Sequence, residues 1–214
     1  VPPEDPDLTG RPGVTVFQSS GTTYPPERAI DDNFGNFTHT LGTDNAALWE
    51  VDLAGTFDIA EIIIYNRTSC CGSRLRDINV AILDMSGEGE EILWEIELLN
   101  PENEMGAFPL GPPELRLDLV DLDGAPVAGR VVRITRTPDD DLSGSGGQGN
   151  ADEANVLSLG EVEIFELPEC PAPEDPDYGD THCSGVEVTG PEDGGPGEYT
   201  AVADACDDTD DPVH

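Results

Sequence analysis

Short stretches in which apolar and polar residues alternate run through most of this chain, and none shows the longer apolar period of a capped helix. In "LRLDLV" (115–120) and "GEVEIFEL" (160–167) the alternation is strict, as expected for strands with one face on a core and one in water. An Asp-Gly turn, "DLDGAP" (121–126), separates two of the stretches. The predicted strands are 14–17, 48–53, 59–66, 75–84, 91–98, 115–120, 130–136 and 157–167.

This pattern predicts an all-β fold, a jelly-roll β-sandwich of about eight strands, over residues 13–167. The flanks 1–12 and 168–185 are rich in Pro, Asp and Glu without periodicity, which is typical of linkers. Both flanks contain "PEDPD", which suggests a string of modules. Residues 186–214 resemble the opening strands of an immunoglobulin-like or polycystic-kidney-disease-type (PKD) sandwich. They are too few to bury a core, so we interpret them as the incomplete start of a second β-domain.

The charge balance excludes several classes of partner. The chain has 46 acidic residues against nine basic ones, all arginine, for a net charge of −37. Such a chain does not bind nucleic acid by counterion release, and anionic membrane surfaces repel it. No apolar run reaches the roughly 18 residues of a membrane span, so we expect no membrane insertion. The chain begins without Met or an apolar leader, as expected for a mature product or a piece of a longer one.

Five cysteines in Asp/Gly/Pro-rich surroundings favour an extracellular or cell-surface, secreted location. Cys70 and Cys71 are adjacent within "YNRTSCCGSRLRD" (65–77). Adjacent Cα atoms lie about 3.8 Å apart, below the usual disulfide range, so a bond between the two would be strained. Separate partners or free thiols are the alternatives. Cys170 and Cys183 can close the second linker, but other pairings with Cys206 remain open, and the odd count leaves one cysteine unmatched within the chain.

Two groups of residues carry candidate binding chemistry. Arg67 and Arg74 flank the cysteine pair, and guanidinium forks with a histidine such as His39 can hold neighbouring sugar hydroxyls. The alternative for the arginines is ion pairing with the abundant carboxylates. The stretch "ERAIDDNFGNFTHT" (27–40) is rich in Asp and Asn, and Asp31 and Asn36 can supply oxygens to calcium; the alternative is a surface loop of turn formers.

Catalytic motifs are missing from the sequence. No serine lies in a G-x-S-x-G elbow, no His/Cys pair has zinc spacing, and no glycine-rich loop opens a helix to cradle phosphate. We therefore expect a binding module rather than an enzyme.

Several of these motifs together resemble the F-type lectin (fucolectin) branch of the galactose-binding-like superfamily, also called the discoidin or coagulation factor 5/8 type C superfamily. "VFQSS", "AIDDN", "THT", "LWEVDL", "YNRTSCCGSRL", "VVRITR" and "LSLGEVEIF" occur in the expected order from Gly13 to Glu166. The resemblance implies a jelly roll with one structural calcium ion and a shallow site for L-fucose.

Carried over residue by residue, the resemblance implies that His39, Arg67 and Arg74 hold the sugar and that Cys70 and Cys71 form a vicinal disulfide packed against it. The implied calcium ligands are the side chains of Asp31, Asn36 and Glu161 and the carbonyls of Arg28, Asn33 and Gly160.

The leading interpretation is a calcium-stabilised carbohydrate-binding module for terminal fucose or a galactose-like neutral glycan, beside other modules of the same polypeptide. One departure stands against it: the family motif usually has an aspartate that orients the arginines two residues after the first Arg, where this chain has Ser69. That departure favours a structural or adhesion spacer that binds no sugar. A further alternative is an accessory module of a larger extracellular enzyme.

Overall fold

The structure, a computed structural model, describes residues 7–68, 71–85, 89–101, 113–140 and 154–167. Within these ranges the chain forms seven strands joined in one sheet, with only three short helical segments. The strands are β1 (Thr15–Gln18), β2 (Leu48–Tyr65), β3 (Ile78–Asp84), β4 (Glu91–Leu99), β5 (Glu114–Asp118), β6 (Val127–Arg136) and β7 (Glu161–Glu166). The helical segments are η1 (Pro26–Ala29), η2 (Gly72–Arg74) and α1 (Leu119–Asp123). The predicted all-β fold is confirmed.

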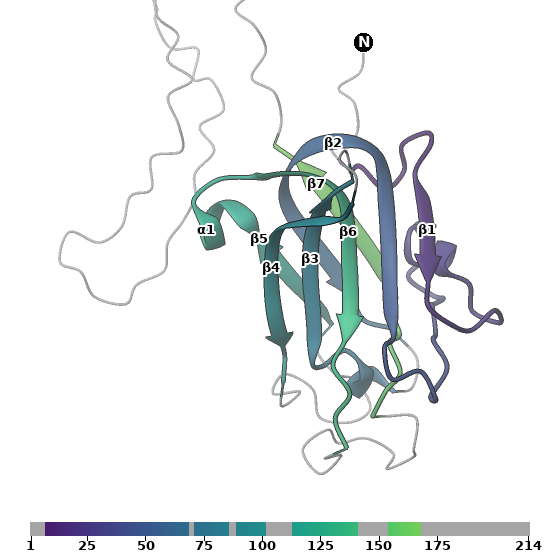
Figure 1. Cartoon of the computed structure of the whole chain (residues 1–214). Helices are drawn as coiled ribbons and strands as arrows, with labels where there is room; N and C mark the ends of the chain where they lie inside the picture. Colours follow the sequence, from purple (N-terminus) through teal and green to yellow (C-terminus); the bar gives the residue numbers. More distant parts are fainter. Residues whose placement is uncertain (1–6, 69–70, 86–88, 102–112, 141–153, 168–214) are drawn as a thin grey trace, which may run out of the picture. The chain divides into compact units, whose positions relative to one another are not determined.

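Strand β2 organises the sheet, because its two halves pair with different strands (Figure 1). The first half lies between β1 and β6, and the order continues through β3 to β4. The second half lies between β5 and β7. Every pairing is antiparallel. The sheet is thereby folded into two layers, with β5 and β7 behind β3, β4 and β6 in Figure 1.

The bend in β2 follows Asp52, where the register against β6 shifts. Ala54 has φ +62°, a conformation that residues other than glycine adopt rarely, and its N–H donates to Asp52 Oδ1 at 2.8 Å. Arg130 of β6 donates to both oxygens of the same carboxylate, at 2.8 and 2.9 Å. These bonds, led by that from Arg130, hold the pKa of Asp52 below its ordinary value, although burial acts against them. Asp52 therefore joins the bend to the neighbouring strand.

Several details of the predicted strands are wrong. Residues 75–77 and 157–160 precede β3 and β7 instead of belonging to them, and the described residues form seven strands where about eight are predicted. The stretches 48–53 and 59–66 form one continuous strand, because the residues between them bend β2 rather than end it. Leu119 and Val120 lie in α1 instead of a strand. The physical reason is a helix cap: the Asp118 side chain accepts from the N–H of Asp121 at 3.0 Å.

The core between the layers is aliphatic, as the alternating pattern predicts. Trp49 is its largest fully buried member, and its indole N–H donates to the Pro26 carbonyl at 3.0 Å, which seats η1 against the core. Other fully buried side chains are Leu8, Ile59, Ile62, Ile64, Leu75, Ile78, Ile82, Leu119 and Ile134.

Residues 7–12, predicted as linker, belong to the fold. Leu8 is fully buried, its N–H donates to the Ile164 carbonyl at 2.7 Å, and Arg11 forms an ion pair with Glu166. Residues 1–6, the second linker (168–185), the start of a second β-domain (186–214), and Cys170, Cys183 and Cys206 lie outside the described residues. Among the segments that are described, no helix is long and apolar enough to cross a membrane.

Candidate functional site

Loops from three parts of the sequence meet at one end of the sheet. β1 ends and β2 begins there, since Gln18 pairs with Trp49. β2 ends beside the start of β7, since Tyr65 pairs with Glu161, and β6 ends beside the start of β3. The segments 19–47, 66–77 and 137–160 must therefore leave and enter the sheet at this end. They carry every predicted sugar-binding and calcium-binding residue except Glu161, which is the first residue of β7.

His39 and Arg74 are in direct contact, although 35 residues separate them in sequence. Arg74 Nη1 lies 2.7 Å from His39 Nε2, and His39 Nδ1 lies 2.6 Å from the Thr40 carbonyl oxygen. A guanidinium only donates and a carbonyl only accepts. The imidazole must therefore be neutral, with its proton on Nδ1 and its Nε2 lone pair directed at Arg74. Both ring nitrogens are thus engaged in contacts within the protein.

Arg67 lies against an aromatic ring. Its guanidinium carbon is 3.5 Å from the centre of the Phe37 ring, and its Nη1 donates to Ser158 Oγ at 3.3 Å. Phe37 stacks on Tyr24 with ring centres 4.9 Å apart, and Tyr24 lies 5.6 Å from the His39 ring. Arg67 is only 6% exposed. The aromatic pair thus connects Arg67 to the His39–Arg74 pair across the site.

A tight turn presents Arg74. Cys71 is buried and has φ +72°, and its carbonyl accepts from the N–H of Arg74 at 3.1 Å. Asn66 Nδ2 donates to the Gly72 carbonyl at 2.8 Å, which ties the end of β2 to η2. Cys70 and Ser69 lie outside the described residues, so the Cys70–Cys71 disulfide stays a prediction.

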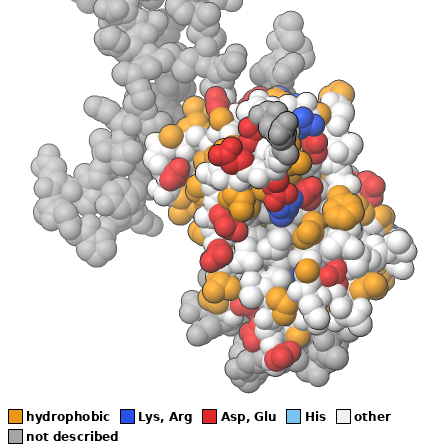
Figure 2. All heavy atoms as spheres, in the orientation of Figure 1, with side chains coloured by type: hydrophobic (Ala, Val, Ile, Leu, Met, Phe, Trp, Pro, Cys, Tyr) orange, Lys and Arg blue, Asp and Glu red, His pale blue; other side chains and the backbone are white. Residues whose placement is uncertain are grey.

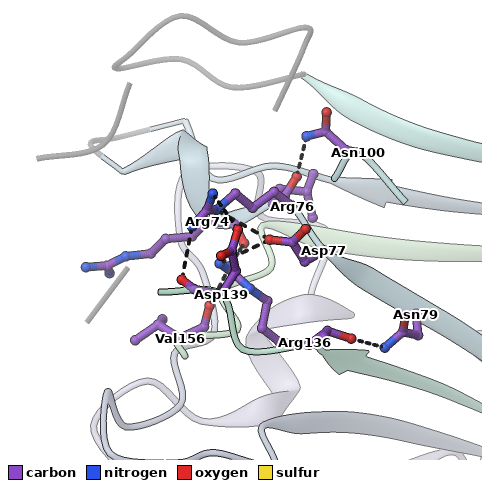
Figure 3. A network of polar contacts seen from close by, with 10 residues as sticks. Arg74, Arg76, Asp77, Asn79, Asn100, Arg136, Asp139 and Val156 are labelled. Carbon is purple, nitrogen blue, oxygen red and sulfur yellow. Dashed lines mark hydrogen bonds and ion pairs between the residues drawn. The ribbon is translucent and has the colours of Figure 1, made fainter. Parts of the chain in front are cut away.

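A network of buried charges lies next to this turn (Figure 3). Arg76 Nε lies 3.6 Å from Asp77 Oδ2, and Arg76 Nη1 lies 3.4 Å from Asp139 Oδ2. Arg136 Nη2 lies 3.9 Å from Asp77 Oδ2. Burial raises the pKa of Asp77, while Arg136 and Arg76 act to lower it. Arg136 Nη1 also donates to the Arg74 carbonyl at 2.7 Å. Sequence reasoning assigned no role to Arg136 or Asp77, although Arg136 ends the "VVRITR" stretch and Asp77 ends "YNRTSCCGSRLRD".

A hollow of about 380 Å³ opens beside His39. Gly21 forms its edge with φ +83°, and a Cβ atom there would lie 2.4 Å from the His39 carbonyl oxygen, so only glycine fits. Leu41, which is 53% exposed, also lines the hollow. The lining residues are Gly21, Thr22, Thr23, Tyr24, His39 and Leu41. The hollow offers an aromatic ring, an aliphatic side chain and two hydroxyls next to the paired imidazole.

Glu161 lies at a second cluster of oxygens. It is 2% exposed, Oε1 accepts from the N–H of Asp32 at 3.3 Å, and Oε2 is buried without a hydrogen-bond partner. Burial, with the nearby charges of Asp31, Asp32 and Glu163, raises the pKa of Glu161 to about 7, although the bond from Asp32 N–H lowers it. A buried carboxylate oxygen without a hydrogen-bond partner is costly, so the arrangement calls for a proton or a cation.

The loop that faces Glu161 contains a second buried oxygen without a hydrogen-bond partner, Asn36 Oδ1. Asn36 Nδ2 donates to Asp31 Oδ2 at 2.7 Å, and the Asn33 carbonyl accepts from Asn36 N–H at 3.1 Å. No group of three or more His, Cys, Asp or Glu residues is arranged around a common point in the described ranges. A metal ion here would therefore depend largely on amide and carbonyl oxygens.

Comparison with known proteins agrees with this fold. Residues 28–101 match the family model of the NedA-like, galactose-binding domain of F5/F8 type C proteins. Fucolectin-5 of Anguilla japonica is 33% identical over 70 residues, which are 33% of this chain and 36% of that protein. The match therefore spans about a third of fucolectin-5.

Two solved structures cover most of the described domain. A fucose-binding module of Streptococcus pneumoniae, SpX-3, aligns with a TM-score of 0.53 and 25% identity over 72% of this chain and 95% of that module. A histidine mutant of the lectin domain of lectinolysin, complexed with Lewis b, aligns with a TM-score of 0.55 and 24% identity over 76% of this chain and 98% of that domain. The domain is similar to the jelly rolls of the galactose-binding-like, F5/8 type C family and, among them, to a fucolectin and a fucose-binding module, so the predicted resemblance is confirmed.

Proposed function

We propose that this domain is a carbohydrate-binding module that recognises a terminal fucose or a galactose-like neutral sugar through His39, Arg67 and Arg74. The observation that carries the proposal is the contact between His39 and Arg74, with Arg67 linked to it through Phe37 and Tyr24. The guanidinium forks suit the directed hydrogen bonds of neighbouring hydroxyls, and His39 would join them when a sugar hydroxyl takes the place of Arg74 at its Nε2. The vicinal disulfide Cys70–Cys71 would add an apolar surface beside them.

The kinds of sugar follow from charge and shape. Acidic side chains are spread over the face seen in Figure 2, with few arginines among them, so sulfated and sialylated glycans are disfavoured. Tyr24 and Leu41 give the hollow beside His39 an apolar surface suited to a sugar ring. A shallow polar site buries little apolar area, so affinity per site is modest. Neighbouring modules would supply avidity.

Calcium would stabilise the loop that precedes His39. The buried oxygens Glu161 Oε2 and Asn36 Oδ1, neither with a hydrogen-bond partner, support this assignment. Calcium prefers carboxylate, amide and carbonyl oxygens, and its charge would offset the burial of Glu161. The residues that would hold it are Asp31, Asn36 and Glu161 by their side chains and Arg28, Asn33 and Gly160 by their carbonyls.

A secreted or cell-surface location is proposed with this function. Cysteine-containing, acidic, Pro-rich flanks and the similarity to a fucolectin support it. The second candidate function, a spacer without sugar binding, is favoured by Ser69, which replaces the family's orienting aspartate. An accessory module of a larger extracellular enzyme would use the same binding site.

A glycan array tests the proposal. The full chain, in saturating calcium, should bind fucose- or galactose-terminated glycans, and Arg67→Ala should abolish that signal. Arg116→Ala is the matched control, because Arg116 is an exposed arginine on β5 that pairs with Glu61 and Glu114, outside the site. Failure of the wild-type chain to bind any glycan would overturn the proposal in favour of the spacer.

A further inference from the structure

Two separate segments of the chain supply most of the lining of the hollow beside His39. Residues 21–24 form one part of the lining, and the exposed side chain of Leu41 forms another. The Tyr24 carbonyl accepts from the N–H of His39 at 3.3 Å, so the first segment is joined to the proposed site. Gln18 Nε2 donates to the carbonyls at the two ends of this segment, at 2.7 and 3.1 Å. The segment is therefore bonded at both of its ends.

Ser20, which directly precedes residues 21–24, joins them to Leu41. Its hydroxyl accepts from the N–H of Leu41 at 3.0 Å and donates to Asp44 Oδ2. Because the hydroxyl proton is directed at the carboxylate, an oxygen lone pair is left for the Leu41 N–H. Asp44 in turn donates from its own N–H to the Leu41 carbonyl at 3.0 Å. Asp44 thus orients the hydroxyl that connects the two parts of the lining.

The carboxylate of Asp44 is well suited to this role. Burial acts to raise its pKa, but the bonds from Ser19, Ser20 and the N–H of Ala46 together hold the pKa below its ordinary value. The group is therefore charged at neutral pH, and the hydroxyl bonds that it accepts are of the stronger, charge-assisted kind.

The neighbouring Ser19 makes the same two kinds of bond at a different place. Its hydroxyl donates to the same Asp44 oxygen but accepts from the N–H of Leu48 at 3.0 Å. Leu48 is the first residue of β2, whereas Leu41 lines the hollow. The two serines share one carboxylate and differ in what they hold: Ser19 holds the start of the strand, and Ser20 holds the lining.

We propose that Ser20, oriented by Asp44, is a positioning residue of the binding site: it holds Leu41 beside residues 21–24, so that the hollow is formed before a sugar enters it. A preformed surface spares the sugar the cost of ordering side chains on binding. This inference rests on the proposed sugar binding for its effect on affinity, while the hold on Leu41 can be measured without any sugar.

The test compares Ser20→Ala with Ser19→Ala in the full chain. Each variant removes one half-buried hydroxyl that bonds to Asp44 and to one backbone N–H, so the melting temperatures should fall by similar amounts. In the sugar-free protein, Ser20→Ala should speed hydrogen exchange of the Leu41 amide by about fivefold, the loss of one hydrogen bond, and leave that of Leu48 unchanged. Ser19→Ala should do the reverse.

Fucose affinity separates a positioning role from a merely structural one. Ser20→Ala should weaken L-fucose binding by about fivefold, because binding must then also order one side chain, and Ser19→Ala should weaken it much less. Asp44→Ala should weaken binding at least as much as Ser20→Ala. Ser20→Thr keeps the hydroxyl and should restore both the slow exchange of Leu41 and the affinity.

Unchanged Leu41 exchange in Ser20→Ala would overturn the proposal, as would equal losses of fucose affinity in Ser20→Ala and Ser19→Ala. Faster Leu41 exchange in Ser20→Ala, in a chain that binds no sugar at all, would support the hold on Leu41 and contradict only the proposed function.

Discussion

Arg74 Nη1 lies 2.7 Å from His39 Nε2, so the imidazole uses its lone pair on a neighbouring guanidinium. We predict that His39 is present as the neutral Nδ1–H tautomer in the sugar-free protein, since Nδ1 must donate to the Thr40 carbonyl. Nitrogen chemical shifts of the ring measure this directly at neutral pH. Shifts typical of an Nε2–H tautomer would contradict the contact.

Replacement of Arg74 by lysine should remove most sugar affinity while the fold is retained. Lysine keeps the charge, but it presents one compact ammonium group where the arginine presents a planar fork, so the bond to His39 and the bonds to the sugar cannot be made together. Arg74→Lys should weaken fucose binding by at least about tenfold, the equivalent of one charged hydrogen bond. Arg133→Lys is the control, because Arg133 lies in β6 outside the proposed site, and it should leave fucose affinity unchanged. Calorimetric titration of both variants with L-fucose measures the difference in affinity.

Substitution of Gly21 tests whether the position of His39 depends on the close approach of Gly21 at the edge of the hollow. Gly21→Ala would place a Cβ 2.4 Å from the His39 carbonyl and would strain a residue at φ +83°. Gly124→Ala introduces a similar strain at φ +80° with no atom within 4 Å of the new Cβ. Both should cost about 1 kcal/mol from backbone strain. Only Gly21→Ala should also reduce fucose affinity, and equal affinity in the two variants would show that His39 does not depend on this close approach.

Calcium should raise the melting temperature of the chain through Glu161. At a calcium concentration of about 100 times the dissociation constant the stabilisation is about 2.7 kcal/mol, which is roughly 5–10 °C for a domain of this size. Glu161→Gln should lose that gain. Glu163→Gln, in the same strand but bonded to the Tyr65 hydroxyl, should keep it. A calcium-dependent shift that survives Glu161→Gln would place the ion elsewhere.

Asp52, at the bend of β2, should make the stability of the fold depend on pH in the acid range. Its pKa is lowered in the folded state, chiefly by Arg130, so its contribution is present above the unfolded pKa of about 4 and is lost as pH falls through the lower folded value. Asp52→Asn should therefore melt below wild type at about pH 7, and the gap should narrow toward about pH 3. Thermal melts across this range measure it; a gap that is constant with pH would mean that the charge of Asp52 does not stabilise the bend.

Most of the fold could be predicted from the alternation of apolar and polar residues, because strands with one buried face must show that period. The continuity of β2 could not, since "AGTF" (54–57) has the composition of a turn and only the pairing with β6 keeps it in the sheet. Likewise, α1 is only five residues long and begins at a cap formed by Asp118. A helix this short has the same sequence pattern as a turn.

The site was partly predictable. Arg67 and Arg74 could be found because a motif with adjacent cysteines contains them, and His39 because it lies in "THT"; the structure brings all three to one end of the sheet. Ser158, Arg136 and the aromatic pair could not, because nothing in their local sequence distinguishes them from ordinary strand or loop residues. The contacts that give Ser158 and Arg136 their roles join residues that lie 62 to 120 positions apart.

The central claim is that this end of the domain holds a neutral sugar with His39, Arg67 and Arg74. Calorimetric titration of the 214-residue chain with L-fucose in saturating calcium tests it most directly. We predict one binding site with a dissociation constant between about 10 µM and 1 mM, the range of a shallow polar site, and no measurable binding in Arg67→Ala. Absence of heat in the wild-type chain with both L-fucose and galactose, or equal heat in Arg67→Ala, would contradict it.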